Sequence, residues 1–355
     1  MDAQRDVCEK IFRITSCRFT PAYYAFNCVT KLFAMAVAAL ATAMSGLLPA
    51  GDASAQAYPS RTVRIVVPFA PGGAVDFVGR LLAERLTATV GQQFIVENRP
   101  GGFGTIGSEL VAKSAPDGHL LLVQASVHVI NAALLPKLPY DTWADFTHIT
   151  RVSEGPTVLI VNNAIPAKDA REFASLIRKR PGLINTGTES IGSAGHLAME
   201  LFRNASGSRF EIINYKGAGP ALIDIQGGHI AGMFGTMIAT RPQVLAGKVR
   251  ALGVTAAKRS AALPEVPTMI EQGFPAFEMY SWHGVYGPAN LPKEVVGTLT
   301  GALSKIMQGP EARERLSTQG FEPIVSTSQQ FLEFQKKEFV LYERLIREGK
   351  IRIEQ

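Results

Sequence analysis

Two glycines and an aspartate that follow the chain's first strand-like run have the residue types of an anion site. Gly72, Gly73 and Asp76 follow the strand-like residues 63–67 after four further residues and lie where a helical pattern opens. The first turn of a helix has unpaired backbone N–H groups and a positive dipole end, and glycine lets a ligand approach the backbone closely. An anion, most simply a carboxylate, is expected there. Asp76 either caps these amides itself or accepts a donor group from the ligand, and the residues alone leave both roles open.

The side chains that an enzyme would need are not arranged in a recognisable motif. Ser190 lies in a segment that resembles a nucleophile elbow, but the glycine two residues before the serine is missing. A hydrolase would therefore need a dispersed triad. The glycine loops match neither a phosphate loop nor a dinucleotide-binding turn. No metal site is expected, because close metal-ligand spacing is absent among the six histidines, His119, His128, His148, His196, His229 and His283.

The elements that must position these residues alternate along the chain. Strand-like runs separated by helical patterns predict parallel-rich sheets with helices on both faces, an α/β fold. The runs are residues 63–67, 94–97, 120–124, 158–161, 212–215, 230–234 and 249–254. Two extended stretches, 155–163 and 280–288, are expected to cross between two lobes. The first lobe would comprise residues 58–157 and 287–355, the second residues 158–286, with a ligand cleft between them.

Several predicted loops follow strands and precede helices, where ligands bind in open α/β sheets. They are residues 69–76, 101–107, 125–128, 186–196 and 216–220. Each supplies backbone amides or hydroxyl groups, which are neutral donors and not reactive groups. His196, at the start of a predicted helix, either touches the ligand or caps its own loop.

The N-terminal segment predicts export. An apolar run at residues 32–48 follows Lys31 and leads to an Ala-x-Ala cleavage site, so residues 1–57 are expected to be a signal peptide cut after Ala57. All three cysteines, Cys8, Cys17 and Cys28, precede that cut. The remaining 298 residues carry 31 Lys and Arg against 26 Asp and Glu, a net charge of +5. Without a basic run interleaved with aromatic residues, nucleic-acid binding is not expected.

The same segments closely resemble the Bug family, the extracytoplasmic solute receptors of tripartite tricarboxylate transporters. The resemblance spans essentially all of residues 58–355. It is carried, in order, by residues 58–76, 96–102, 112–118, 135–141, 215–217, 220–221, 227–228, 246–255 and 263–268. It implies a two-lobed periplasmic binding protein fold of type II-like form that closes on a small carboxylate. It further implies no covalent chemistry, no cofactor, delivery to the membrane permease subunits of such a transporter, a periplasmic location and a monomer.

The resemblance also implies ligand-binding residues, which belong to loops of both lobes. They are Phe69, Gly72, Gly73, Asp76, Ser126, His128, Thr188, Ser190, Ser193, His196, Gly217 and Thr236. Two departures from the family pattern bear on the ligand. After Phe234 the chain reads Gly235-Thr236, so that a frequently acidic position is lost. In the facing loop, Glu189 stands where a small polar residue is usual, and Ala194 and Gly195 replace hydroxyl residues. These changes predict a roomier, less polar pocket that favours an aromatic or monocarboxylic ligand over a polycarboxylate.

Two other classes of function compete with a transport receptor. One is an extracytoplasmic α/β enzyme acting on small carboxylates, which the missing reactive motif disfavours. The other is a ligand sensor that signals to a membrane kinase. A neighbouring permease gene would favour transport, and a neighbouring sensor kinase without one would favour signalling.

Overall fold

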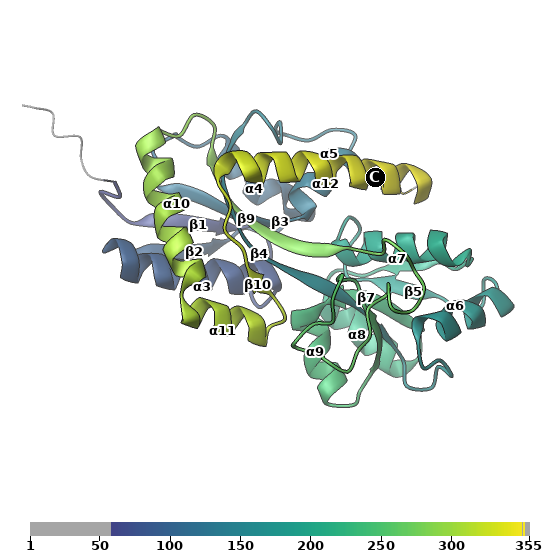
Figure 1. The fold of residues 1–355 in the computed structure, drawn as a ribbon. Helices are drawn as coiled ribbons and strands as arrows, with labels where there is room; N and C mark the ends of the chain where they lie inside the picture. The colour runs from purple at the N-terminus through teal and green to yellow at the C-terminus, as the bar shows by residue number, and fades with distance from the viewer. Residues whose placement is uncertain (1–57, 350, 352–355) are drawn as a thin grey trace, which may run out of the picture. The chain divides into compact units, whose positions relative to one another are not determined.

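A mixed sheet of ten strands organises the described part of the chain (Figure 1). The computed structural model describes residues 58–349 and 351, and the predicted signal peptide lies outside them. The strand order is β2-β1-β3-β9-β4-β7-β5-β6, and β8 and β10 pair with β4 beside this path. Parallel pairs at both ends of the sheet flank antiparallel pairs in the middle.

The first strand group is built from alternating strands and helices. It comprises β1 (Val63–Val67), α3 (Ala74–Val90), β2 (Phe94–Asn98), the short 3₁₀ helix η1 (Gly102–Gly104), α4 (Thr105–Ala112), β3 (Leu120–Ala125) and α5 (Val127–Leu134). Successive side chains of a strand point to opposite faces of a sheet. Val66 and Leu122 accordingly pack in one core with Ile130 of α5. Ile65 and Leu121 pack in another core with the apolar face of α3. The continuous apolar runs of β1 and β3 thus follow from cover on both faces.

The second strand group repeats this construction. It comprises α6 (Ala170–Lys179), β5 (Thr186–Thr188), α7 (Ala194–Ser206), β6 (Ile212–Asn214), α8 (Ala218–Gly227), β7 (Gly232–Thr236), α9 (Met237–Leu245) and β8 (Arg250–Val254). Leu159 of β4 shares a core with Phe202 of α7, while Ile160 shares another with Ile225 of α8. The sheet is therefore covered on both faces here as well.

Two long strands, β4 (Phe146–Val161) and β9 (Tyr280–Pro288), connect the two groups (Figure 1). They pair with each other in antiparallel direction. β9 also pairs with β3, and the last residues of β4 pair with β7 and β8. The predicted parallel pairing holds within each group, but the connecting strands run antiparallel. An apolar run shows that a strand is buried and does not show its direction.

The C-terminal elements return to the first group. They are α10 (Lys293–Gln308), α11 (Pro310–Thr318), β10 (Glu322–Pro323) and α12 (Ser328–Gly349). α12 packs against α5 and β4 and reaches α7 of the second group. There Arg203 donates a hydrogen bond to the carbonyl oxygen of Gly349 at 3.0 Å. Within the described part of the chain, none of the helices combines the length and the apolar character that crossing a membrane requires.

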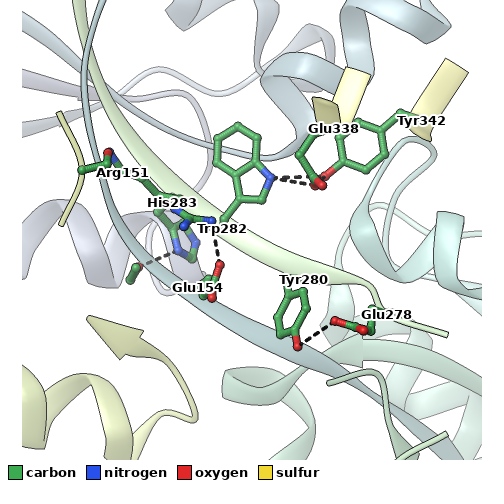
Figure 2. A network of polar contacts seen from close by, with 10 residues as sticks. Arg151, Glu154, Glu278, Tyr280, Trp282, His283, Glu338 and Tyr342 are labelled. Carbon is green, nitrogen blue, oxygen red and sulfur yellow. Dashed lines mark hydrogen bonds and ion pairs between the residues drawn. The ribbon is translucent and has the colours of Figure 1, made fainter. Parts of the chain in front are cut away.

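A buried polar network ties α12 to the crossing of β4 and β9 (Figure 2). The indole N–H of Trp282 lies 3.3 Å from a carboxylate oxygen of Glu338 and 3.2 Å from the hydroxyl oxygen of Tyr342. The Tyr342 hydroxyl donates to the same carboxylate. Nearby, the Arg151 guanidinium lies 3.9 Å from the ring centroid of Phe334. These contacts satisfy polar groups that burial would otherwise destabilise.

Tyr342→Phe removes the hydroxyl from this network and leaves the half-buried Glu338 carboxyl with one donor fewer. We expect a loss of unfolding free energy of about 1–3 kcal/mol, measured by urea denaturation. Tyr280→Phe is the matched control, because the Tyr280 hydroxyl is on a partly exposed residue of the same crossing and water can replace it. Equal losses in the two variants would contradict a special role for the buried network.

Candidate functional site

The loop after β1 is held by the carboxylate of Asp76. The backbone N–H of Gly72 donates to Asp76 Oδ2 at 3.0 Å, and Arg80 Nε donates to the same oxygen at 2.9 Å. Asn98 Nδ2 donates to Asp76 Oδ1 at 2.8 Å and to the carbonyl oxygen of Phe69 at 3.0 Å. Asp76 is only 3% exposed. Of the two roles that the sequence left open, these contacts favour the one in which Asp76 binds its own loop.

These contacts also control the ionisation of Asp76. Burial alone would raise its pKa, but hydrogen bonds from Arg80, Gly72 and Asn98, together with the charge of Arg80, lower the pKa below its ordinary value. The carboxylate is therefore ionised at neutral pH and available as an acceptor for all three donors.

Gly72 and Gly73 leave the start of α3 open. Gly72 has a φ of +90°, a left-handed conformation that favours glycine. A Cβ atom added at either position would meet no atom within 4 Å. Gly73 is the N-cap residue, and no side chain caps the helix. There is therefore open space beside the start of α3, where the sequence predicts an anion.

The structure separates Ser126 from His128. Ser126 follows β3 as the N-cap residue of α5, and its hydroxyl makes no hydrogen bond to any described residue. His128 is completely buried, with its ring 4.7 Å from that of Tyr286 and 4.8 Å from that of Phe146. Burial and the neighbouring His148 lower the pKa of His128 to about 3. It lies in the core behind the loops and is not brought to their surface.

Three helices of the second strand group begin at the carboxyl ends of their strands. Ser193 caps α7, with its Oγ accepting the backbone N–H of His196 at 3.1 Å. Gly217 precedes α8 and Thr236 precedes α9, neither with a side-chain cap. Thr188 Oγ1 lies 3.3 Å from Ser193 Oγ. The edge thus presents helix N-termini and hydroxyl groups, which suit an anion.

His196 fastens its own loop, one of the two roles that the sequence allowed. Its Nδ1 accepts the backbone N–H of Gly192 at 3.1 Å. Burial, with a smaller effect of Arg203, lowers the pKa of His196 to about 4. The imidazole is therefore neutral near pH 7 and can serve as this acceptor.

The loop at residues 188–196 lies against α5 of the first strand group. A Cβ atom added at Gly192 would be 3.0 Å from Leu134 Cδ2 and 3.5 Å from Ile130 Cγ2. From the same helix, Asn131 Nδ2 donates to the carbonyl oxygen of Phe103 at 3.0 Å. α5, which begins after Ser126, therefore contacts loops of both groups.

The predicted site residues fall into three sets. Phe69, Gly72, Gly73 and Asp76 span the loop after β1 and the first turn of α3, and Thr188, Ser190, Ser193 and His196 run from the end of β5 to the first turn of α7. Ser126, Gly217 and Thr236 are the N-cap residues of α5, α8 and α9, whereas His128 lies in the core. Sequence reasoning missed Asn98 and Asn131 as loop supports, although Asn98 belongs to the quoted segment 96–102. Within residues 58–349 and 351, no group of three or more His, Cys, Asp or Glu side chains is placed to hold a metal ion.

Asp76→Asn replaces the charged acceptor of the loop by a neutral amide. We expect a loss of about 2 kcal/mol of unfolding free energy at pH 7, because hydrogen bonds to a charged group are lost. The pKa of Asp76 is lower in the folded protein than in the unfolded chain, where it is near 3.9. The ionised carboxylate therefore stabilises the folded state at pH values above about 3.9, and this stabilisation is lost as the pH falls through the folded-state pKa. The difference from the wild type should therefore shrink toward acidic pH in urea titrations.

The control for this prediction is Asp117→Asn. Asp117 also accepts a backbone N–H and pairs with Arg61, but its side chain is 43% exposed. Its contribution is screened by solvent, so the loss should be clearly smaller. A difference between wild type and Asp76→Asn that does not depend on pH would contradict the role of the ionised carboxylate.

Comparisons with known proteins identify the family. Residues 78–351 match the family described as tripartite tricarboxylate transporter family receptor. BugT of Bordetella pertussis is 33% identical over 322 residues, covering 90% of this chain and 98% of BugT. A solved R. palustris protein with adipate is similar with a TM-score of 0.79 and 32% identity, covering 83% of this chain and 99% of that one.

Two further solved structures are similar over most of the chain. The periplasmic binding protein BugD has a TM-score of 0.76 and 32% identity, covering 84% of this chain and 100% of its own. MatC from Rhodopseudomonas palustris with bound malate has a TM-score of 0.74 and 31% identity, covering 81% and 100%. The predicted α/β fold of a two-lobed periplasmic binding protein is confirmed. The chain belongs to the family of tripartite tricarboxylate transporter receptors, as its sequence motifs predict.

Proposed function

We propose that this protein is an extracytoplasmic receptor that captures a small carboxylate and delivers it to the membrane permease of a tripartite tricarboxylate-type transporter. The observation that carries the proposal is the gathering of helix N-termini and hydroxyl groups at the carboxyl ends of strands in both groups. Such groups bind carboxylates without reacting with them. The relatives solved with adipate and with malate support the same ligand class.

Closure around the ligand is the second part of the proposal. The lobes are residues 58–157 with 287–355, and residues 158–286, with β4 and β9 as the connections. A ligand that contacts the loop at residues 69–76 and the loop at residues 188–196 gains both sets of contacts only when the lobes are closed. Binding therefore shifts the population toward the closed form.

The remaining parts concern where the protein acts and what it does not do. Residues 1–57 direct export and are removed, the receptor acts in the periplasm as a monomer, and it leaves its ligand chemically unchanged. Support comes from the receptor family and from the absence of a reactive motif in the sequence. Incubating candidate acids with the protein and assaying for products tests the enzyme alternative, which turnover would favour.

The function is tested by a thermal-shift screen of the protein from Tyr58 onward. The ligands are mono-, di- and tricarboxylates, amino acids and aromatic acids, with calorimetry on the hits. Selective binding raises the melting temperature by mass action, by an amount that grows with ligand concentration. The protein is first unfolded and refolded to remove any retained ligand, and the released material is identified by mass spectrometry. No shift and no released acid would contradict the receptor proposal.

Ser126→Ala separates binding from folding. The Ser126 hydroxyl has no partner among the described residues, so its loss should leave unfolding free energy nearly unchanged. A lost hydrogen bond to the charged ligand should raise the dissociation constant about tenfold, measured by calorimetry. Ser114→Ala is the control for the loss of a serine hydroxyl that is not in the predicted site. The Ser114 hydroxyl donates a hydrogen bond to the carbonyl oxygen of Val111 at the end of α4. An unchanged affinity in Ser126→Ala would remove this residue from the site.

A further inference from the structure

Glu189 is an acidic side chain among the neutral donors of the second strand group. It directly follows β5, which pairs in parallel with β7. Its backbone carbonyl accepts the N–H of Gly217 at 2.7 Å, which fixes the start of α8 beside it. Thr188 and Ser190, two of the predicted ligand-binding residues, are its chain neighbours. The position of Glu189 in the candidate site therefore follows from the backbone.

The side chain of Glu189 is half-buried, beside the start of α9. Burial is the main influence on its carboxyl group and raises its pKa to about 7, while the nearby backbone N–H of Thr236 lowers the pKa in part. Thr236 is the N-cap residue of α9. No Lys or Arg within the described ranges forms an ion pair with Glu189. The carboxyl group thus lies beside a helix N-terminus and has no Lys or Arg partner among the described residues.

This arrangement limits what a ligand can place nearby. An acid is favoured at a helix N-terminus, and here the protein itself supplies that acid. A ligand carboxylate beside Glu189 would meet a like charge where solvent screening is reduced. A ligand hydroxyl or ammonium group would instead donate a charge-assisted hydrogen bond to it. The open first turn of α3 remains available for one ligand carboxylate.

We propose that Glu189 determines the ligand class, by selecting a small acid that has one carboxylate and a hydrogen-bond donor at its other end over a dicarboxylate of equal length. This inference rests on the proposed carboxylate-binding function and narrows it. It also goes beyond the family resemblance, because Glu189 is one of the positions at which this chain departs from the usual family pattern.

The test compares matched acids that differ only at one end. The first set is succinate, γ-hydroxybutyrate and γ-aminobutyrate, and the second is adipate, ε-hydroxycaproate and ε-aminocaproate. The hydroxy and amino members distinguish a neutral donor from a cationic one. Dissociation constants are measured by calorimetry at about pH 8.5, where the Glu189 carboxyl group is ionised. Each protein is the chain from Tyr58 onward, refolded to remove retained ligand and checked by circular dichroism.

Three proteins are compared: the wild type, Glu189→Gln and Glu211→Gln. Glu211 is an exposed residue just before β6, at the opposite end of that strand from the candidate loops, so its variant controls for the loss of one negative charge. We expect the wild type to prefer the hydroxy or amino member of a set. Glu189→Gln should shift the ratio of affinities toward the dicarboxylate by at least about tenfold. Glu211→Gln should keep the wild-type ranking.

Two results would overturn the inference in distinguishable ways. If the wild type binds acids and Glu189→Gln keeps the same ranking, with or without a loss of stability, Glu189 only caps α9 and the receptor function stands. If the folded wild type and both variants bind none of these acids and none from the broader screen, the receptor proposal fails, and the inference fails with it.

Discussion

The antiparallel pairing of β4 with β9 is the constraint on which the rest of the structure depends. These strands are hydrogen-bonded from Phe146 opposite Pro288 to Pro156 opposite Tyr280, and each continues into pairing with a different strand group. Every helix N-terminus of the candidate site is positioned by a sheet that β4 or β9 joins. α12 reinforces the crossing through Glu338 and Tyr342, whose polar groups meet the Trp282 indole (Figure 2).

The candidate site follows from what this framework leaves free. Parallel strands bring their carboxyl ends to one edge, and the helices that follow begin there with unpaired amides. The Asp76 carboxylate and the His196 imidazole accept hydrogen bonds from backbone N–H groups of their own loops. These side chains therefore fix the conformation of the loops. Buried histidines such as His128 and His196 are neutral near pH 7, because burial lowers their pKa. The other groups of the candidate site are largely neutral donors, and Glu189 is the acidic residue among them.

Much of the fold could be predicted from the sequence because it depends on local patterns. The apolar run of β1 and the extended stretch of β9 have the predicted bounds, and the glycine turn before α3 has the left-handed conformation that its residues indicate. β5 was missed because Thr186–Thr188 is too short to show a period. β4 is longer than predicted, since Arg151 and Glu154 interrupt its apolar pattern and are accommodated by pairing with each other at 2.8 Å.

The roles of single site residues were less predictable, because distant partners decide them. Whether Asp76 faces a ligand or its own loop depends on Asn98, 22 positions later in the chain. His128 reads as a loop residue beside Ser126, yet Tyr140, Phe146 and Tyr286 enclose its ring. Such contacts form only when elements far apart in sequence pack together, so the local sequence pattern does not indicate them.

The central claim, that one carboxylate is held by loops of both strand groups, is tested most directly by hydrogen–deuterium exchange with and without a saturating acid found in the screen. The account predicts slower exchange in residues 69–76 and in residues 188–196 together, because the ligand engages helix N-termini on both sides. Protection confined to one of these loops, or located away from both, would contradict it.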